Sequence, residues 1–104
     1  MGNSNRRDPQ GQFTANILTE AIKAFGDVPA SYGTLIDLGT SYTYTHFLVV
    51  NSLDADIMIK FGDSEITFQA NKDIWMDGIK LDGIIQYKYK VGAPTSGGIQ
   101  VICY

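Results

Sequence analysis

Short stretches in which apolar and polar residues alternate fill most of this chain from Thr34 to Tyr104. Each stretch ends at Gly, Asp, Asn or Pro, residues that interrupt regular structure. A period of two is that of a β-strand with one buried face, so the pattern predicts a series of short strands. We expect about seven of them, at residues 34–38, 42–51, 55–61, 65–69, 72–76, 84–91 and 99–104.

Regularly spaced short strands of this kind predict a mainly β fold, an antiparallel β-sandwich or jelly roll. A chain of 104 residues is long enough for one domain with a single core. Two Asp-Gly steps, Asp77-Gly78 and Asp82-Gly83, predict tight turns, because Gly adopts positive φ at little cost. We place the sandwich domain at residues 31–104.

The first 30 residues differ from the rest, and we expect them to form an N-terminal arm. Residues 1–12 have no apolar residue after Met1, so they bury nothing that offsets the entropy of ordering them, and we expect a neighbouring subunit to hold them. Residues 14–25 carry apolar side chains at helical spacing and predict a short helix, with an irregular extended arm as the competing interpretation. These side chains are Ile17, Leu18, Ala21, Ile22 and Phe25.

Charge and hydropathy argue against two classes of partner. No apolar run approaches the roughly 20 residues that a membrane-spanning helix needs, so we expect no membrane contact. The net charge is −3, and residues 51–83 hold seven acidic residues against three lysines. An acidic domain repels phosphate, so nucleic-acid binding is not expected. Arg6 and Arg7 are the exception, and they suit an acidic partner or nucleic acid.

The residue types that carry catalysis are scarce. His46 and Cys103 are the only histidine and cysteine, and we interpret them as an ordinary strand residue and a small buried hydrophobe. Neither a nucleophile with its base nor a zinc site follows from one of each. The acids around residues 54–65 straddle a strand instead of following one another in a loop, so we interpret them as solvated turn acids and not as a calcium site. The prediction is a protein that is not an enzyme and needs no cofactor or metal.

Aromatic residues leave two interaction hypotheses open. An exposed Tyr or Trp75 would suit sugar stacking, which makes a carbohydrate-binding module the alternative of another class. Tyr42 and Tyr44 share one face of a predicted strand and are candidates for a protein interface. With the N-terminal arm, the predicted interaction residues are Arg6, Arg7, Phe13, Ile17, Leu18, Ile22, Phe25, Tyr42 and Tyr44.

Three segments together resemble the small β-sandwich virion proteins of tailed bacteriophages. They are Asn51-Ser52-Leu53-Asp54 running into IMIKFGD at 57–63, the Asn71-Lys72-Asp73 step, and the closing YKYKVGAPTSGGIQVICY at 87–104. The resemblance implies a structural role without catalytic residues, in a capsid auxiliary (decoration) protein or in a head–tail connector or tail component. It also implies location in the virion, assembly in the bacterial cytoplasm, symmetric contacts between copies, and the major capsid protein or connector and tail subunits as partners. Residues 1–25 fall outside it.

Overall fold

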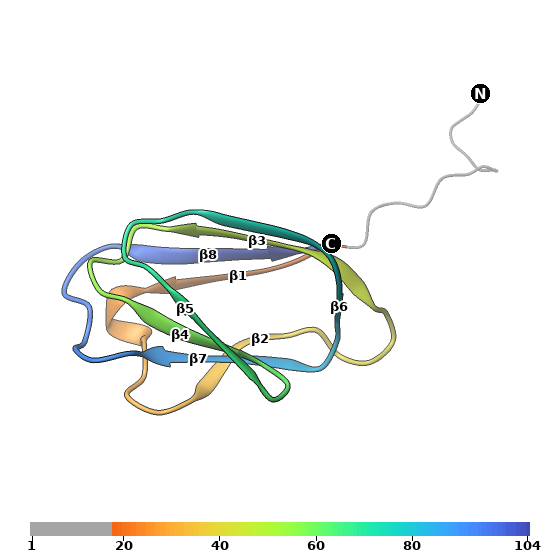
Figure 1. Ribbon diagram of the computed structural model, residues 1–104, viewed down its shortest axis with the longest axis horizontal. Helices are drawn as coiled ribbons and strands as arrows, with labels where there is room; N and C mark the ends of the chain where they lie inside the picture. Colours follow the sequence, from red (N-terminus) through yellow and green to blue (C-terminus); the bar gives the residue numbers. More distant parts are fainter. Residues whose placement is uncertain (1–17) are drawn as a thin grey trace, which may run out of the picture.

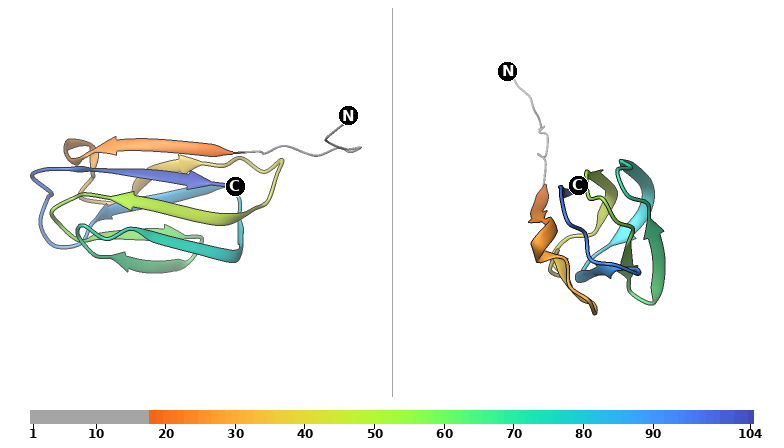
Figure 2. Two further views of the ribbon diagram at one scale, coloured as in Figure 1. Left: turned by 90° about the horizontal axis from the view of Figure 1, so that it is seen from above. Right: turned by 90° about the vertical axis from the view of Figure 1, so that its left-hand side faces the viewer.

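The computed structural model describes residues 18–104, which form two stacked antiparallel sheets of four strands each (Figure 1, Figure 2). The first sheet has the order β1-β8-β3-β6 and the second the order β2-β7-β4-β5. A 3₁₀ turn, η1 (Phe25–Asp27), follows β1, and the described residues contain no α-helix. The strands are β1 (Thr19–Ala24), β2 (Gly33–Asp37), β3 (Tyr44–Asn51), β4 (Ile57–Phe61), β5 (Ser64–Phe68), β6 (Ile74–Leu81), β7 (Ile84–Tyr89) and β8 (Gly98–Cys103).

The connections between strands make this sandwich a jelly roll. Only β4 and β5 are consecutive strands paired within one sheet, and every other connection between described strands passes from one sheet to the other. Eight strands divided between two sheets in this order are the jelly-roll arrangement, and the predicted fold class is confirmed.

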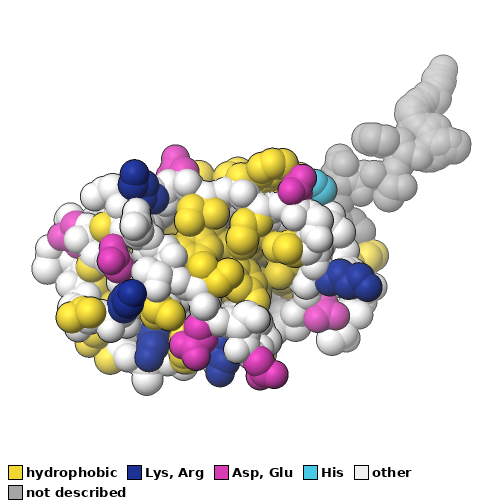
Figure 3. Space-filling view, in the orientation of Figure 1, with side chains coloured by type: hydrophobic (Ala, Val, Ile, Leu, Met, Phe, Trp, Pro, Cys, Tyr) yellow, Lys and Arg dark blue, Asp and Glu magenta, His cyan; other side chains and the backbone are white. Residues whose placement is uncertain are grey.

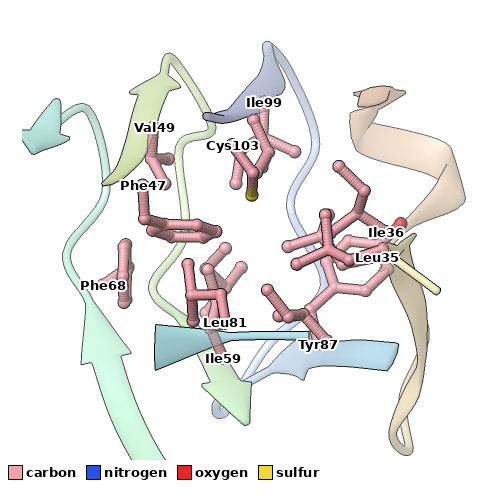
Figure 4. Close-up of a cluster of buried hydrophobic side chains, with 14 of the residues drawn as sticks. Leu35, Ile36, Phe47, Val49, Ile59, Phe68, Leu81, Tyr87, Ile99 and Cys103 are labelled. Atoms are coloured by element: carbon pink, nitrogen blue, oxygen red, sulfur yellow. The ribbon is translucent and has the colours of Figure 1, made fainter. Parts of the chain in front are cut away.

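The core lies between the sheets and is built from the inward half of each alternating strand. In β8, Ile99, Val101 and Cys103 are buried while the residues between them are only partly covered. Phe47 of β3 packs edge-on against Phe61 and Phe68 of the second sheet, with ring centroids 5.0 and 6.2 Å apart. Figure 4 shows Phe47 and Phe68 in the core. Each large side chain buried in this way stabilises the fold by roughly 1.5–3 kcal/mol.

The predicted helix at 14–25 is wrong where the structure describes it. Residues 19–24 are the edge strand β1, paired with β8 from Thr19↔Cys103 to Ala24↔Gly98. Backbone hydrogen bonds to β8 outweigh the helical spacing of a few apolar residues, because local preferences are weak beside tertiary pairing. The sandwich therefore begins before residue 31, where the sequence had placed the domain boundary, and Val28 is part of its core.

Asp77-Gly78, predicted as a tight turn, lies inside β6. The β3–β6 register passes from His46↔Asp77 to Tyr44↔Leu81, so β6 has two more residues than β3 over this interval. Gly78 has φ +70°, and the positive φ serves a bulge at which β6 bends toward the second sheet (Figure 1). Asp82-Gly83 does connect two strands, but it carries the chain from β6 across to β7 in the other sheet.

The loop before β8 is closed against the end of β3 by one carboxylate and one glycine. Asp54 Oδ1 accepts hydrogen bonds from the backbone N–H groups of Thr95 (2.7 Å) and Ser96 (3.3 Å), and Oδ2 accepts one from the Thr95 hydroxyl. Gly97 then passes Ser52 so closely that a Cβ on it would lie 1.9 Å from the Ser52 carbonyl oxygen. This contact sets where β8 enters the sheet.

Cys103 is fully buried, and burial raises the pKa of its thiol to about 12. The thiol therefore stays protonated at neutral pH, and the side chain acts as the small buried hydrophobe that the sequence predicts.

We expect Gly97→Ala to lower the free energy of unfolding by at least about 2 kcal/mol, because it combines a backbone clash with a positive φ. The φ at Gly97 is +88°. Urea unfolding followed by circular dichroism measures the loss. Gly92→Ala is the matched control, since a Cβ there meets nothing within 4 Å. Equal stability of the two variants would contradict the role given to Gly97.

We expect acid to weaken the Asp54 loop. Hydrogen bonds from Thr95 to the carboxylate lower the pKa of Asp54 below its usual value. A carboxyl whose folded pKa is depressed stabilises the fold above its unfolded pKa, near 4, and that contribution disappears as the pH falls through the folded value. Between roughly pH 5 and 2, the free energy of unfolding should therefore depend less steeply on pH in Asp54→Asn than in the wild type. Asp63→Asn, in the exposed β4–β5 turn, should keep the wild-type slope.

Candidate interaction surface

The outward side chains of the first sheet form an apolar surface. The register aligns Ile102 with Leu48 and Leu48 with Trp75, so three apolar residues lie side by side across β8, β3 and β6. Other outward positions of these strands and of β1 are also apolar or aromatic, and several are well exposed: Trp75 is 54% and Ile22 70% exposed. We call this surface the apolar face; it consists of Ile22, His46, Leu48, Val50, Trp75, Ile102 and Tyr104.

Three rings form an aromatic cluster at one end of the apolar face. The His46 and Tyr104 rings are stacked, with centroids 4.5 Å apart and planes 5° from parallel. The Trp75 ring, on β6, has its centroid 6.1 Å from that of His46. The Trp75 indole N–H donates a hydrogen bond of 3.0 Å to the Tyr104 hydroxyl. Backbone hydrogen bonds in both directions join His46 to Tyr104, so the cluster rests on a rigid pair of strands.

The charged groups beside this surface, Glu20 and Asp77, are acidic and lie on its two outer strands, whereas Lys80 lies beyond the bulge of β6 and lines the open side of the sandwich. Glu20 faces outward on β1, where it accepts a 2.6 Å hydrogen bond from the Gln100 side chain. Asp77 lies opposite His46 on β6. Apart from Gln100, which lies between Ile22 and Val50 on β8, the surface has an apolar centre and charged groups at its margin, an arrangement found in protein–protein interfaces.

The outer face of the second sheet has the opposite character. Lys60 and Lys88 place their Nζ atoms 5.3 and 4.9 Å from the centre of the Tyr32 ring, and the Tyr32 hydroxyl donates a 2.7 Å hydrogen bond to Glu65. Lys90 donates to the hydroxyl of Thr67. We call this surface the lysine face. The charged groups of the lysine face can be hydrated when this face is exposed to water, whereas the apolar face exposes hydrophobic area to water.

A third feature is the open side of the sandwich, where β5 and β6 are the edge strands of the two sheets. A hollow of about 370 Å³ lies there, and Figure 3 shows hydrophobic side chains gathered in the middle of this side of the molecule. The margin of the apolar face, with the histidine in cyan, is seen at the top of the same view. Apolar residues of the hollow are Phe61, Ile66, Met76, Ile79 and Leu81.

The predicted interaction residues do not lie on one surface. Arg6, Arg7, Phe13 and Ile17 lie outside the described residues. Ile22 belongs to the apolar face, and the exposed Leu18 directly precedes β1. Phe25 is exposed in η1 and Tyr42 in the loop between β2 and β3, and neither lies within a strand of the apolar face.

The prediction that Tyr44 shares an exposed interface with Tyr42 is wrong. Its side chain is 5% exposed, and its hydroxyl makes a 2.9 Å hydrogen bond with the Thr19 hydroxyl. The strand begins only at Tyr44, and its irregular pairing near Thr45 turns Tyr44 toward the core.

Sequence reasoning missed most of the apolar face. His46 was interpreted as an ordinary strand residue, and Leu48, Val50 and Ile102 were not selected. A signal was present, because the run Phe47-Leu48-Val49-Val50 is apolar on both faces of its strand. Such a run is typical of a strand covered on both sides.

The described residues give little sign of other kinds of site. Among residues 18–104, no group of three or more His, Cys, Asp and Glu side chains is placed to hold a metal ion. Over the same range, no helix has the length and apolar character that crossing a lipid bilayer requires. Comparisons with family models, curated proteins and solved structures find no match to this chain.

Proposed function

We propose that the protein is a non-enzymatic structural subunit of a bacteriophage virion, in which the apolar face packs against a neighbouring subunit. The observation that carries the proposal is the contrast between the two outer faces of the sandwich. One is apolar and aromatic with Trp75 exposed, and the other carries Lys60, Lys88 and Lys90. A subunit that is covered on one side and displayed to water on the other has this distribution.

Two further points support the virion assignment. The closing segment at 87–104 resembles small β-sandwich virion proteins, and jelly rolls recur in viral capsids. Fold alone does not establish function, so the argument depends on the surface and on the resemblance together. Within this class, a capsid auxiliary protein that stabilises the head lattice is the favoured role, with a head–tail connector or tail component as the alternative.

A structural role suits modest contacts made many times. The apolar face consists of seven residues, fewer than the roughly 20–30 residues that each side of a standard-size interface contributes. In a symmetric lattice, each such contact is repeated, and the effective concentration of the neighbour raises the total affinity.

We expect Leu48→Thr/Ile102→Thr to reduce incorporation into phage particles several-fold, because it removes apolar area from the centre of the interface. Quantitative mass spectrometry of purified particles measures the copy number. Ile84→Thr is the control, since Ile84 is exposed on the second sheet. Capsid-wide binding predicts on the order of hundreds of copies, and a connector ring about six or twelve. Particles that lack the wild-type protein would contradict the proposal.

The second candidate is a carbohydrate-binding module, favoured by the exposure of Trp75 beside Tyr104 and Asp77. An aromatic ring can stack on a sugar while a nearby carboxylate accepts hydrogen bonds from the sugar hydroxyls. This candidate predicts saturable quenching of the single tryptophan by a sugar, weakened in Asp77→Asn. Unchanged tryptophan fluorescence across a panel of neutral and acidic sugars would contradict the carbohydrate-binding function.

A further inference from the structure

We propose that the apolar face of one copy binds residues 1–17 of a second copy of this chain. The inference deepens the proposed function by naming the occupant of the face. It rests on the apolar face being an assembly surface and does not depend on the virion assignment.

The described chain begins at the margin of the apolar face. β1 is the edge strand of the first sheet, and its first residue, Thr19, pairs with Cys103, which directly precedes Tyr104. Leu18 is exposed at this point. Residues 1–17 therefore join the sheet at the end where the aromatic cluster lies. The apolar face of a second copy bound at this end would be close enough for them to contact.

The chemistry of residues 1–17 is complementary to the face. Arg6 and Arg7 exceed the single acid in the segment, and Phe13 and Ile17 are its main apolar side chains. The charged groups that face outward on the apolar face, Glu20 and Asp77, are both acidic. Phe13 suits the aromatic cluster and the arginines suit the acidic margin, an arrangement that fixes register as well as affinity.

The dimensions favour a neighbour's face over the chain's own. Phe13 is five residues before Leu18, which span at most about 17 Å when fully extended. Trp75 lies three strand spacings from β1, about 14 Å across the sheet. The chain's own Tyr104 lies next to the start of β1, so distance alone excludes only the far side of the face. To reach any part of its own face, however, the segment would have to reverse direction at Leu18, and to reach Trp75 it would also have to be almost fully extended. Asn16 is the one residue typical of turns between Phe13 and Leu18, and a reversal there would leave only three residues, about 10 Å, which does not span the distance to Trp75. Docking on a second copy needs no reversal.

Two other occupants fit less well. Pairing two apolar faces would bring acidic margins together, and like charges at an interface are unfavourable. Stacking the lysine face on the apolar face would bury Lys60 and Lys88 against hydrophobic side chains, which costs the hydration of their ammonium groups.

The experiment uses three full-length variants. The arm variant is Arg6→Glu/Arg7→Glu/Phe13→Ser, and the face variant is Leu48→Thr/Ile102→Thr. Ile84→Thr is the control on the second sheet. Threonine suits strands, so we expect the face variant to keep the wild-type fold, which circular dichroism checks. Sedimentation velocity over a range of concentrations reports the association of each protein alone and in pairs.

We expect the wild type and Ile84→Thr to self-associate and the arm and face variants to stay monomeric. An equal mixture of these two variants should form a 1:1 complex, because one supplies an intact face and the other an intact arm. A synthetic peptide of residues 1–17 should dissociate the wild-type assembly. It should also change the Trp75 emission of the arm variant, with an affinity for the face variant at least about tenfold weaker.

Three results would overturn the proposal. Self-association of the arm variant would mean that the face pairs with another surface. A wild type that stays monomeric above the peptide's dissociation constant, while the peptide binds, would assign the face to its own chain. A peptide that does not bind would exclude the segment altogether. If the peptide fails while the face variant is still lost from phage particles, the face binds another virion protein, and the proposed function stands without this inference.

Discussion

The pairing of β8 between β1 and β3 is the interaction on which the rest of this structure depends. It joins the edge strand of the first sheet to its centre, with register partners from Thr19↔Cys103 and Phe47↔Cys103 onward. Its alternation sends Ile99, Val101 and Cys103 into the core and leaves Ile102 and Tyr104 on the outer surface. The close approach of Gly97 to Ser52 is compatible with this register and would clash if a Cβ were added, so the loop before β8 and the alternation of β8 together determine which side chains the apolar face presents.

The sequence was sufficient for the fold class but only for part of the surface. Alternation in 55–61 and 84–91 is a local property, and the strands it predicted are present as β4 and β7. The edge strand β1 was missed because its pairing partner lies some 80 positions away, at β8. The aromatic cluster joins residues 46, 75 and 104, and no periodicity within one segment brings them together. Cross-strand neighbours of this kind follow from register, which a single sequence does not specify.

The two outer faces of the sandwich differ in chemical character. A sandwich with one apolar and one charged face has a preferred side to bury, and Lys60, Lys88 and Lys90 mark the side that stays hydrated. The open β5–β6 side, with its apolar hollow, lies between these two faces.

The jelly-roll connections also bear on when this protein can fold. Among the described strands, only β4 and β5 pair as neighbours in sequence within a sheet, and the remaining pairings wait for distant segments. Folding dominated by such long-range contacts is slow and cooperative. During synthesis, β1 and β3 leave the ribosome well before β8, the strand that must lie between them. The apolar face therefore forms only when β8 completes the sheet, and until then the apolar residues of β1 and β3 belong to unpaired strands that are exposed to aggregation.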